Sequence, residues 1–192
     1  MSDDSNTMRL RISSVVESAI YPALKLLPQN MGTSQAIAMM VAIGLQESRL
    51  AARAQILDGG GKGPARGLWQ FEQGTRESRG GVWGVYLHRS SAEPLRLLCR
   101  ALDVNYDPRS IWAELEHNDI LAAGVARLLL WTDPGKLPQI GKAQDAWDCY
   151  VRTWRPGKPK PESWVRLYGL AIENLSETLD HIQTTEGELK NG

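Results

Sequence analysis

The sequence predicts a mainly α-helical fold built as one domain. At least six segments place apolar residues at helical spacing, and strand patterns occupy at most a minor region. A chain of 192 residues with 42% hydrophobic and 23% charged residues is long enough to bury one sizeable core. We therefore expect residues 1–192 to form a single domain, with residues 1–8 and 184–192 flexible.

The first half of the chain predicts two helices. Residues 9–27 follow a helical pattern that Pro22 would kink or divide. A second helix starts at Thr33 or Ser34 and runs to about Glu47 or Arg49. Its residues 36–45 carry no polar side chain, so we expect it to lie in the middle of the protein, with a carboxylate at its exit.

Residues 51–82 have no helical period. The stretch "ILDGGGKGPARG" holds five of the 18 glycines, which is typical of a loop. The following "GLWQFE" reads as a short strand or the start of a helix. We expect a Gly-rich loop or a small hairpin between the second helix and the rest.

The second half returns to helical patterns. Ser90 and Glu93 stand at capping-box spacing before "PLRLLCRAL", and Asp107 precedes a helix from Pro108 through Leu115. Further helices are predicted over 118–131, 142–154 and about 162–181, with "RPGKPKP" breaking the chain between the last two.

Composition and charge argue against several classes of protein. The 22 basic and 22 acidic residues give no net charge, so nucleic acid or a membrane surface would need a local basic patch, and we expect neither partner. The N-terminus lacks a secretory signal, and no apolar run reaches the ~20 residues of a membrane span. We expect a soluble monomer made in the cytoplasm.

Cofactors and metals are not expected either. Cys99 and Cys149 lie 50 positions apart without a CxxC pattern, which favours two buried free thiols. His88, His117 and His181 show no ligand-pair spacing, and a zinc or Cys/His peptidase or amidase would need one.

The position of Glu47 at the end of a helix has two interpretations. On a helix its carboxyl starts against apolar surface, and burial would raise its pKa until it can protonate a glycosidic oxygen near neutral pH. Gly44, one turn earlier, would leave room for a substrate. The alternative is an exposed residue at a helix end, paired with Arg49 or Arg53.

The stretch "GPARGLWQFE" offers groups that suit a polysaccharide. Gly63 and Gly67 allow close backbone approach, and Gln70 provides an amide. Flat faces for sugar rings come from Trp69, Phe71 and, further on, Trp83, whereas Trp131, Trp147 and Trp154 stand at core spacing.

In order along the chain, several short motifs resemble those of the soluble lytic transglycosylase and goose-type lysozyme group. Glu47 and Ser48 in "GLQES" match its Glu-Ser motif, and "GLWQ" matches its Gly-Leu-Met-Gln motif at Gly67, Leu68 and Gln70. "NDILAAGVARLL" matches at Asn118, Ile120 and Gly124, and Tyr150 in "AWDCY" matches the tyrosine of a third motif.

The sequence differs from the family's usual motifs at several points, and it also resembles a particular set of the family's members. Trp69 replaces the usual methionine, Val151 stands where asparagine is usual, and the gap of 23 residues from Glu47 to Gln70 is longer than usual. Together with "WRPGKP", the motifs resemble bacteriophage-encoded members, either endolysins or virion-associated enzymes. Such a protein would reach the host cell wall through holin release or virion delivery.

The resemblance implies a lysozyme-like fold and cleavage of the β-1,4 bond between N-acetylmuramic acid and N-acetylglucosamine in peptidoglycan. Glu47 would be general acid and then base, and the lytic transglycosylase product would be 1,6-anhydro-N-acetylmuramic acid. Ser48 would orient Glu47 or touch substrate, Gln70 and Trp69 would bind sugar, and Tyr150 would point its hydroxyl into the cleft.

Two alternatives stay open. A hydrolytic lysozyme needs a second carboxylate, for which Asp58, Glu72 and Glu77 are the nearest in sequence; Asp58 could fold back from the Gly-rich loop. A non-catalytic wall-binding or tail module would keep the fold without activity.

Overall fold

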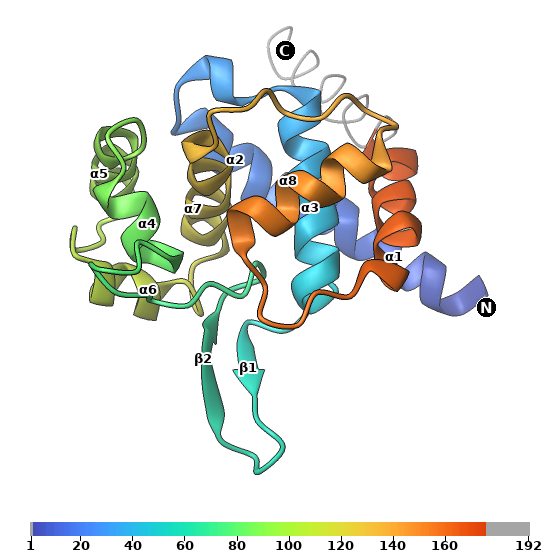
Figure 1. Ribbon diagram of the computed structural model, residues 1–192, viewed down its shortest axis with the longest axis horizontal. Helices are drawn as coiled ribbons and strands as arrows, with labels where there is room; N and C mark the ends of the chain where they lie inside the picture. The colour runs from blue at the N-terminus through green and yellow to red at the C-terminus, as the bar shows by residue number, and fades with distance from the viewer. Residues whose placement is uncertain (1, 176–192) are drawn as a thin grey trace, which may run out of the picture.

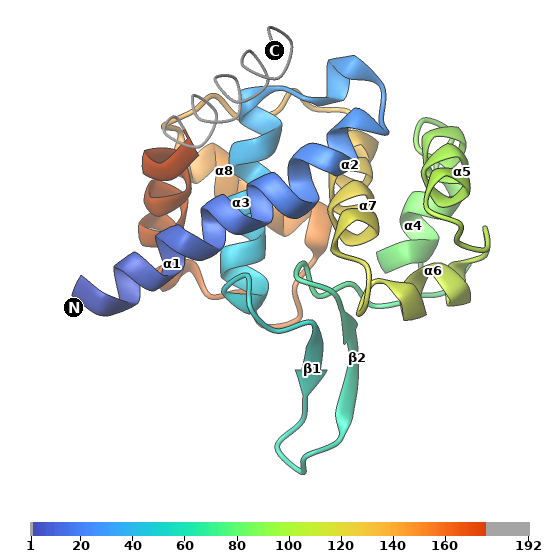
Figure 2. The same ribbon diagram turned by 180° about the vertical axis from the view of Figure 1, so that it is seen from behind.

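The computed structural model describes residues 2–175 and confirms that the protein is mainly helical. Helix α3 runs through the centre, with α7 beside it and α8 crossing it, while α1 lies across the opposite face (Figures 1 and 2). Helices α4, α5 and α6 gather beyond α7. The predicted flexible segment 184–192 lies outside the described residues.

In chain order the elements are α1 (Ser2–Val15), a π-helical turn (Val16–Ile20), α2 (Tyr21–Lys25), a 3₁₀ turn (Gln29–Met31), α3 (Ser34–Ser48), β1 (Ala54–Ile56), β2 (Lys62–Arg66), α4 (Gly81–Leu87), α5 (Ala92–Ala101), α6 (Pro108–Glu114), α7 (Asp119–Thr132) and α8 (Ala143–Trp154). A last helical segment covers 161–175.

Helix α3 is the buried central helix that its apolar sequence predicts. Thr33 caps it by accepting a 3.2 Å hydrogen bond from the Ala36 N–H, and residues 36–45 are all buried. The helix ends where Arg49 adopts a left-handed conformation (φ 58°) and its N–H returns to two helical carbonyls. Glu47 therefore lies in the last turn of α3, where the helix reaches the surface.

The first helix starts at Ser2 rather than near residue 9, and Met8 is already buried, so residues 2–8 are helical where a flexible segment 1–8 was predicted. The predicted interruption near Pro22 takes the form of a π-helical turn between α1 and α2. In this turn, the Tyr21 N–H bonds to the Val16 carbonyl five residues back, and the wider turn makes room for the Pro22 ring, which has no N–H to donate.

The Gly-rich region forms a two-stranded antiparallel hairpin that projects from the helical body (Figure 1). Residues 57–61 make its tip, where Gly60 has a positive φ of 82°. Lys62 and Arg66 of β2 both pair with Glu116, which anchors the hairpin to the segment before α7.

The "GLWQFE" segment is neither strand nor helix. Arg66 and Phe71 exchange two backbone hydrogen bonds around a tight turn of residues 67–70, which we call the GLWQ turn. Gly67 has φ 73°, and a Cβ there would lie 2.8 Å from the Leu115 carbonyl oxygen, so only glycine fits.

Two predictions about the second half need correction. Helix α4 was not expected, because "GGVWGVYL" is short and holds glycines. The capping box is wrong: the cap residue of α5 is Ser91, the Ser90 hydroxyl bonds to His88 Nδ1, and Glu93 pairs with Arg96. The other expected helices form within the described residues, and residues 176–181 of the last one lie outside them. Asp107 and Asn118 cap α6 and α7 with their side chains.

The two cysteines are buried free thiols, as predicted. Burial raises the pKa of both Cys99 and Cys149 to about 11. None of the helices in residues 2–175 has an apolar stretch long enough to cross a bilayer.

Candidate active site

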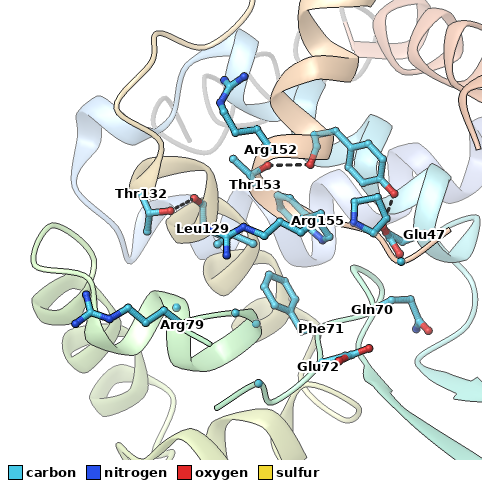
Figure 3. A pocket seen from close by; sticks show the side chains of 18 of the residues that line it. Glu47, Gln70, Phe71, Glu72, Arg79, Leu129, Thr132, Arg152, Thr153 and Arg155 are labelled. Carbon is cyan, nitrogen blue, oxygen red and sulfur yellow. Dashed lines mark hydrogen bonds between the residues drawn. The ribbon is translucent and has the colours of Figure 1, made fainter. Parts of the chain in front are cut away.

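A cavity of about 1100 Å³ opens beside the end of α3. Its walls come from the last turn of α3, the GLWQ turn and the residues after it, the start of α4, and the ends of α7 and α8 (Figure 3). The chain that follows α8, residues 155–160, completes the rim. Segments more than a hundred residues apart thus meet at one opening.

Glu47 reaches this cavity with a carboxyl that is mostly removed from water. The Tyr150 hydroxyl donates a 2.7 Å hydrogen bond to Glu47 Oε1. Burial raises the Glu47 pKa above its ordinary value of 4.5, and the hydrogen bond from Tyr150 opposes that rise in part. A carboxyl held in this way keeps its proton to a higher pH than an exposed glutamate does, which favours proton transfer to a bound molecule.

Tyr150 is fixed by α8 and by its ring. Its side chain is 3% exposed, and the ring stacks on Trp164 at 5.1 Å with 11° between the planes. Burial, followed by the nearby Glu47 charge, raises the Tyr150 pKa, so the hydroxyl keeps the proton that it donates to Glu47. The prediction that this hydroxyl points at the cleft agrees with its contact to Glu47.

Replacing Tyr150 with Phe is expected to raise the Glu47 pKa further, because a hydrogen bond that favours the carboxylate is lost. Carboxyl carbon chemical shifts followed by NMR through a pH titration measure this. Tyr168→Phe is the control, since that hydroxyl bonds to the Gln139 carbonyl instead. An unchanged or lowered Glu47 pKa in Tyr150→Phe would contradict the assignment.

The GLWQ turn is fastened to α3 and α8 by three hydrogen bonds. Ser48 Oγ donates to the Leu68 carbonyl at 2.6 Å, and Trp69 Nε1 donates to the Met40 carbonyl at 2.8 Å. Trp154 Nε1 of α8 donates to the Trp69 carbonyl at 3.1 Å. These bonds set the turn beside Glu47.

Ser48 therefore does not orient the Glu47 carboxyl directly. Its hydroxyl lies 2.6 Å from the Leu68 carbonyl and 3.3 Å from the Gly44 carbonyl of its own helix, and it has one proton to donate. The side chain joins the two motifs and thereby positions the turn.

Trp69 corrects the sequence prediction most plainly. Its side chain is fully buried, so it has no face to offer a sugar ring. Gly44 explains why: a Cβ at that position would lie 2.3 Å from Leu50 Cδ2 and 3.3 Å from Trp69 Nε1. The absent side chain at Gly44 makes room for the indole and Leu50, and not for a substrate.

Gln70 does line the cavity. It has a positive φ of 49°, and its amide nitrogen donates to the Ala52 and Gly67 carbonyls at 3.1 and 2.9 Å. With both N–H groups directed at the backbone, the amide oxygen is the group available to a ligand. Phe71 also lines the cavity, packed 5.5 Å from the Trp154 ring.

Asp58 does not join the site. It lies exposed at the hairpin tip and is absent from the described cavity wall, as is the exposed Glu77. Of the nearby carboxylates considered from sequence, Glu72 is the one that lines the cavity with Glu47 (Figure 3). Trp83 packs against Tyr86 and is not part of the wall.

No group of three or more His, Cys, Asp or Glu side chains within the described part of the chain has a geometry suited to a metal ion.

Sequence reasoning missed the role of residues 155–160, which we call the strap. Gln46, next to Glu47, donates from Nε2 to the Lys160 carbonyl at 3.0 Å and accepts from Ser163 Oγ at 3.0 Å. The strap is thereby tied to the last turn of α3. A signal was present: residues 149–161 hold four Lys or Arg and no Asp or Glu.

Comparison of the chain with protein-family models, with curated proteins and with solved structures found no match in any of the three.

Proposed function

We propose that this protein is a muramidase of lysozyme-like fold that cleaves the β-1,4 bond between N-acetylmuramic acid and N-acetylglucosamine as a lytic transglycosylase. The observation that carries the proposal is the mostly buried Glu47 carboxyl, held by Tyr150 at the wall of a large cavity. The order of motifs resembling the lytic transglycosylase and goose-type lysozyme group supplies the substrate class.

In the proposed mechanism, protonated Glu47 gives its proton to the glycosidic oxygen as the bond to the muramic acid C1 breaks. The substrate's N-acetyl group stabilises the positive charge that develops at C1. The 6-hydroxyl of the same sugar then attacks C1 and passes its proton to the Glu47 carboxylate. No water is consumed, the acid is regenerated, and the new end is a 1,6-anhydro sugar.

Tyr150 suits both halves of this cycle. Its hydroxyl can donate to Glu47 Oε1 whether the carboxyl is neutral or charged, and the bond is strongest to the charged form that follows proton transfer. The other carboxyl oxygen is left for the substrate.

Mass spectrometry of the products from purified peptidoglycan tests the proposal. A lytic transglycosylase releases muropeptides with anhydro ends, 18 mass units below the hydrolytic product because no water is added. Reducing ends would instead make the protein a lysozyme. If neither product appears, the non-catalytic wall-binding or tail module becomes the better reading.

A hydrolytic lysozyme is the second candidate, and one observation favours it. Glu72 lines the same cavity as Glu47 and is exposed there, so it is available to activate a water. In that mechanism Glu72→Gln would abolish release of reducing ends. In a transglycosylase the same variant leaves the anhydro products in place.

The variant Asp58→Asn is expected to keep activity within about two-fold of wild type, since Asp58 lies at the exposed hairpin tip away from the cavity wall. Rates of muropeptide release under identical conditions measure this. A loss of a hundred-fold or more, of the size typical for a catalytic carboxylate, would restore Asp58 as the second acid.

The resemblance to bacteriophage-encoded members extends the proposal to a place of action. The protein would be made in the host cytoplasm and reach peptidoglycan through holin pores, as an endolysin, or as part of the virion.

A further inference from the structure

The cavity wall carries an excess of positive charge that the chain as a whole does not have. The full sequence balances 22 basic against 22 acidic residues. The wall holds Arg79, Arg152, Arg155, Lys158 and Lys160 against Glu47, Glu72 and Asp133, which is five cations to three carboxyls. Positive charge is therefore concentrated at this opening.

The Arg152–Asp133 pair does not reduce this excess. Arg152 is bound by Asp133, whose carboxylate is almost buried, so these two charges neutralise each other. Arg79 and the three strap cations remain, opposed by Glu47 and Glu72. None of the four forms a side-chain ion pair with a residue in the range 2–175.

These cations come from opposite sides of the opening. Arg79 lies just before α4, and Arg155 follows α8 on the other wall (Figure 3). Lys158 and Lys160 continue along the strap, and all four side chains are exposed. They stand at the rim, while Glu47 lies mostly buried in the wall.

The strap presents its charges from a restrained backbone. Pro156 and Pro159 fix two of its φ angles, and Gln46 holds the Lys160 carbonyl. At the other end Arg155 closes α8 in a left-handed conformation, with its N–H on the Val151 carbonyl. A rim that is already ordered loses little conformational entropy when it binds an anion.

We propose that the strap binds the carboxylates of stem peptides carried by the glycan strand, so that peptide-bearing strands are preferred over neutral ones. This inference rests on the proposed muramidase function. Sugar rings and N-acetyl groups are uncharged and gain nothing from four exposed cations. Carboxylates on the peptides that branch from a strand in the cavity would project toward the rim, where the cations stand.

The test compares two substrates that differ only in charge. Peptidoglycan strands are freed of phosphate-containing polymers, and half of the preparation has its carboxylates converted to amides. Wild-type kcat/KM is expected to fall about ten-fold on the amidated strands, as for the loss of a few partly exposed ion pairs. Wild type inactive on both substrates would refute the muramidase proposal itself.

The triple variant Arg155→Gln, Lys158→Gln, Lys160→Gln isolates the strap. On native strands its kcat/KM is expected to be about ten-fold below wild type, and on amidated strands the two proteins should agree within about two-fold. The control Arg76→Gln, Arg100→Gln, Arg109→Gln removes the same charge from exposed positions outside the cavity wall and should behave as wild type.

Two results would overturn the strap proposal while leaving the muramidase intact. One is a triple variant that still distinguishes native from amidated strands as wild type does. The other is a strap effect seen only when the phosphate polymers are retained, which would identify those phosphates as the bound anions. Circular dichroism melts establish that each variant is folded.

Discussion

Glu47→Gln is expected to lower the rate of muropeptide release by about a thousand-fold, within the range that a positioned general acid contributes. Glutamine keeps the shape of the side chain, and its amide oxygen can still accept from the Tyr150 hydroxyl. It has no acidic proton to transfer, so the loss falls on the chemical step. Release rates are measured by mass spectrometry of the soluble products.

The same variant is expected to be more stable than wild type at pH 8 and equal to it at pH 4. The Glu47 pKa in the fold lies above 4.5, so the folded state holds this proton more tightly than the unfolded chain does. Below that pH both states are protonated and no difference arises. As the pH rises, the free energy of unfolding of wild type falls by about 1.4 kcal/mol for each unit by which the fold raises the Glu47 pKa. The Glu47→Gln variant has no such proton and does not lose this stability.

Glu77→Gln is the matched control, because Glu77 is exposed and outside the cavity wall. It should change neither the rate nor the melting temperature at either pH. Full activity in Glu47→Gln would remove Glu47 from catalysis. A melting temperature lowered at pH 8 would contradict the raised pKa.

Trp69→Ala is expected to destabilise the fold by about 3–5 kcal/mol, the range for removing a large aromatic side chain from a core. The indole is fully buried, and its N–H bond to Met40 and the Trp154 bond to its carbonyl hold the GLWQ turn in place. With about 2–4 °C for each kcal/mol in a chain of this size, the melting temperature should fall by about 10 °C. Thermal melts measure this.

Trp83→Ala provides the comparison, since Trp83 is only partly buried and packs edge-on against Tyr86. Its melting temperature should fall by less than half as much. If Trp69 were instead a sugar platform, the alanine variant would melt as wild type does and show a raised KM.

The helices were predictable where the sequence carries its own boundaries. Helix α3 has an apolar run that begins after Thr33, and α6 and α7 begin after Asp107 and Asn118, whose side chains cap them. These signals lie in the sequence of each helix itself, so they do not depend on what the helix packs against. Helix α4 lacks them: its cap residue is Gly80, and packing against α5, α6 and α7 holds it in place.

The position of Glu47 at the candidate site was predictable, but the surroundings of Glu47 were less so. Glu47, Gln70 and Tyr150 meet at one cavity, in line with the motif order. Trp69 was misread because an aromatic residue in a Gly-rich stretch resembles an exposed one, and its burial depends on Met40 and Gly44, more than twenty residues earlier. The hairpin likewise carries Asp58 away from Glu47.

The low reactivity of the two native thiols has a practical consequence. With a pKa of about 11, fewer than about one in a thousand molecules of Cys99 or Cys149 is a thiolate at neutral pH, and both side chains are buried. A cysteine introduced on the hairpin tip or the strap would react with a thiol-directed fluorophore far faster. Labelled pairs in the otherwise unaltered chain would then report the distance across the opening when peptidoglycan strands are added.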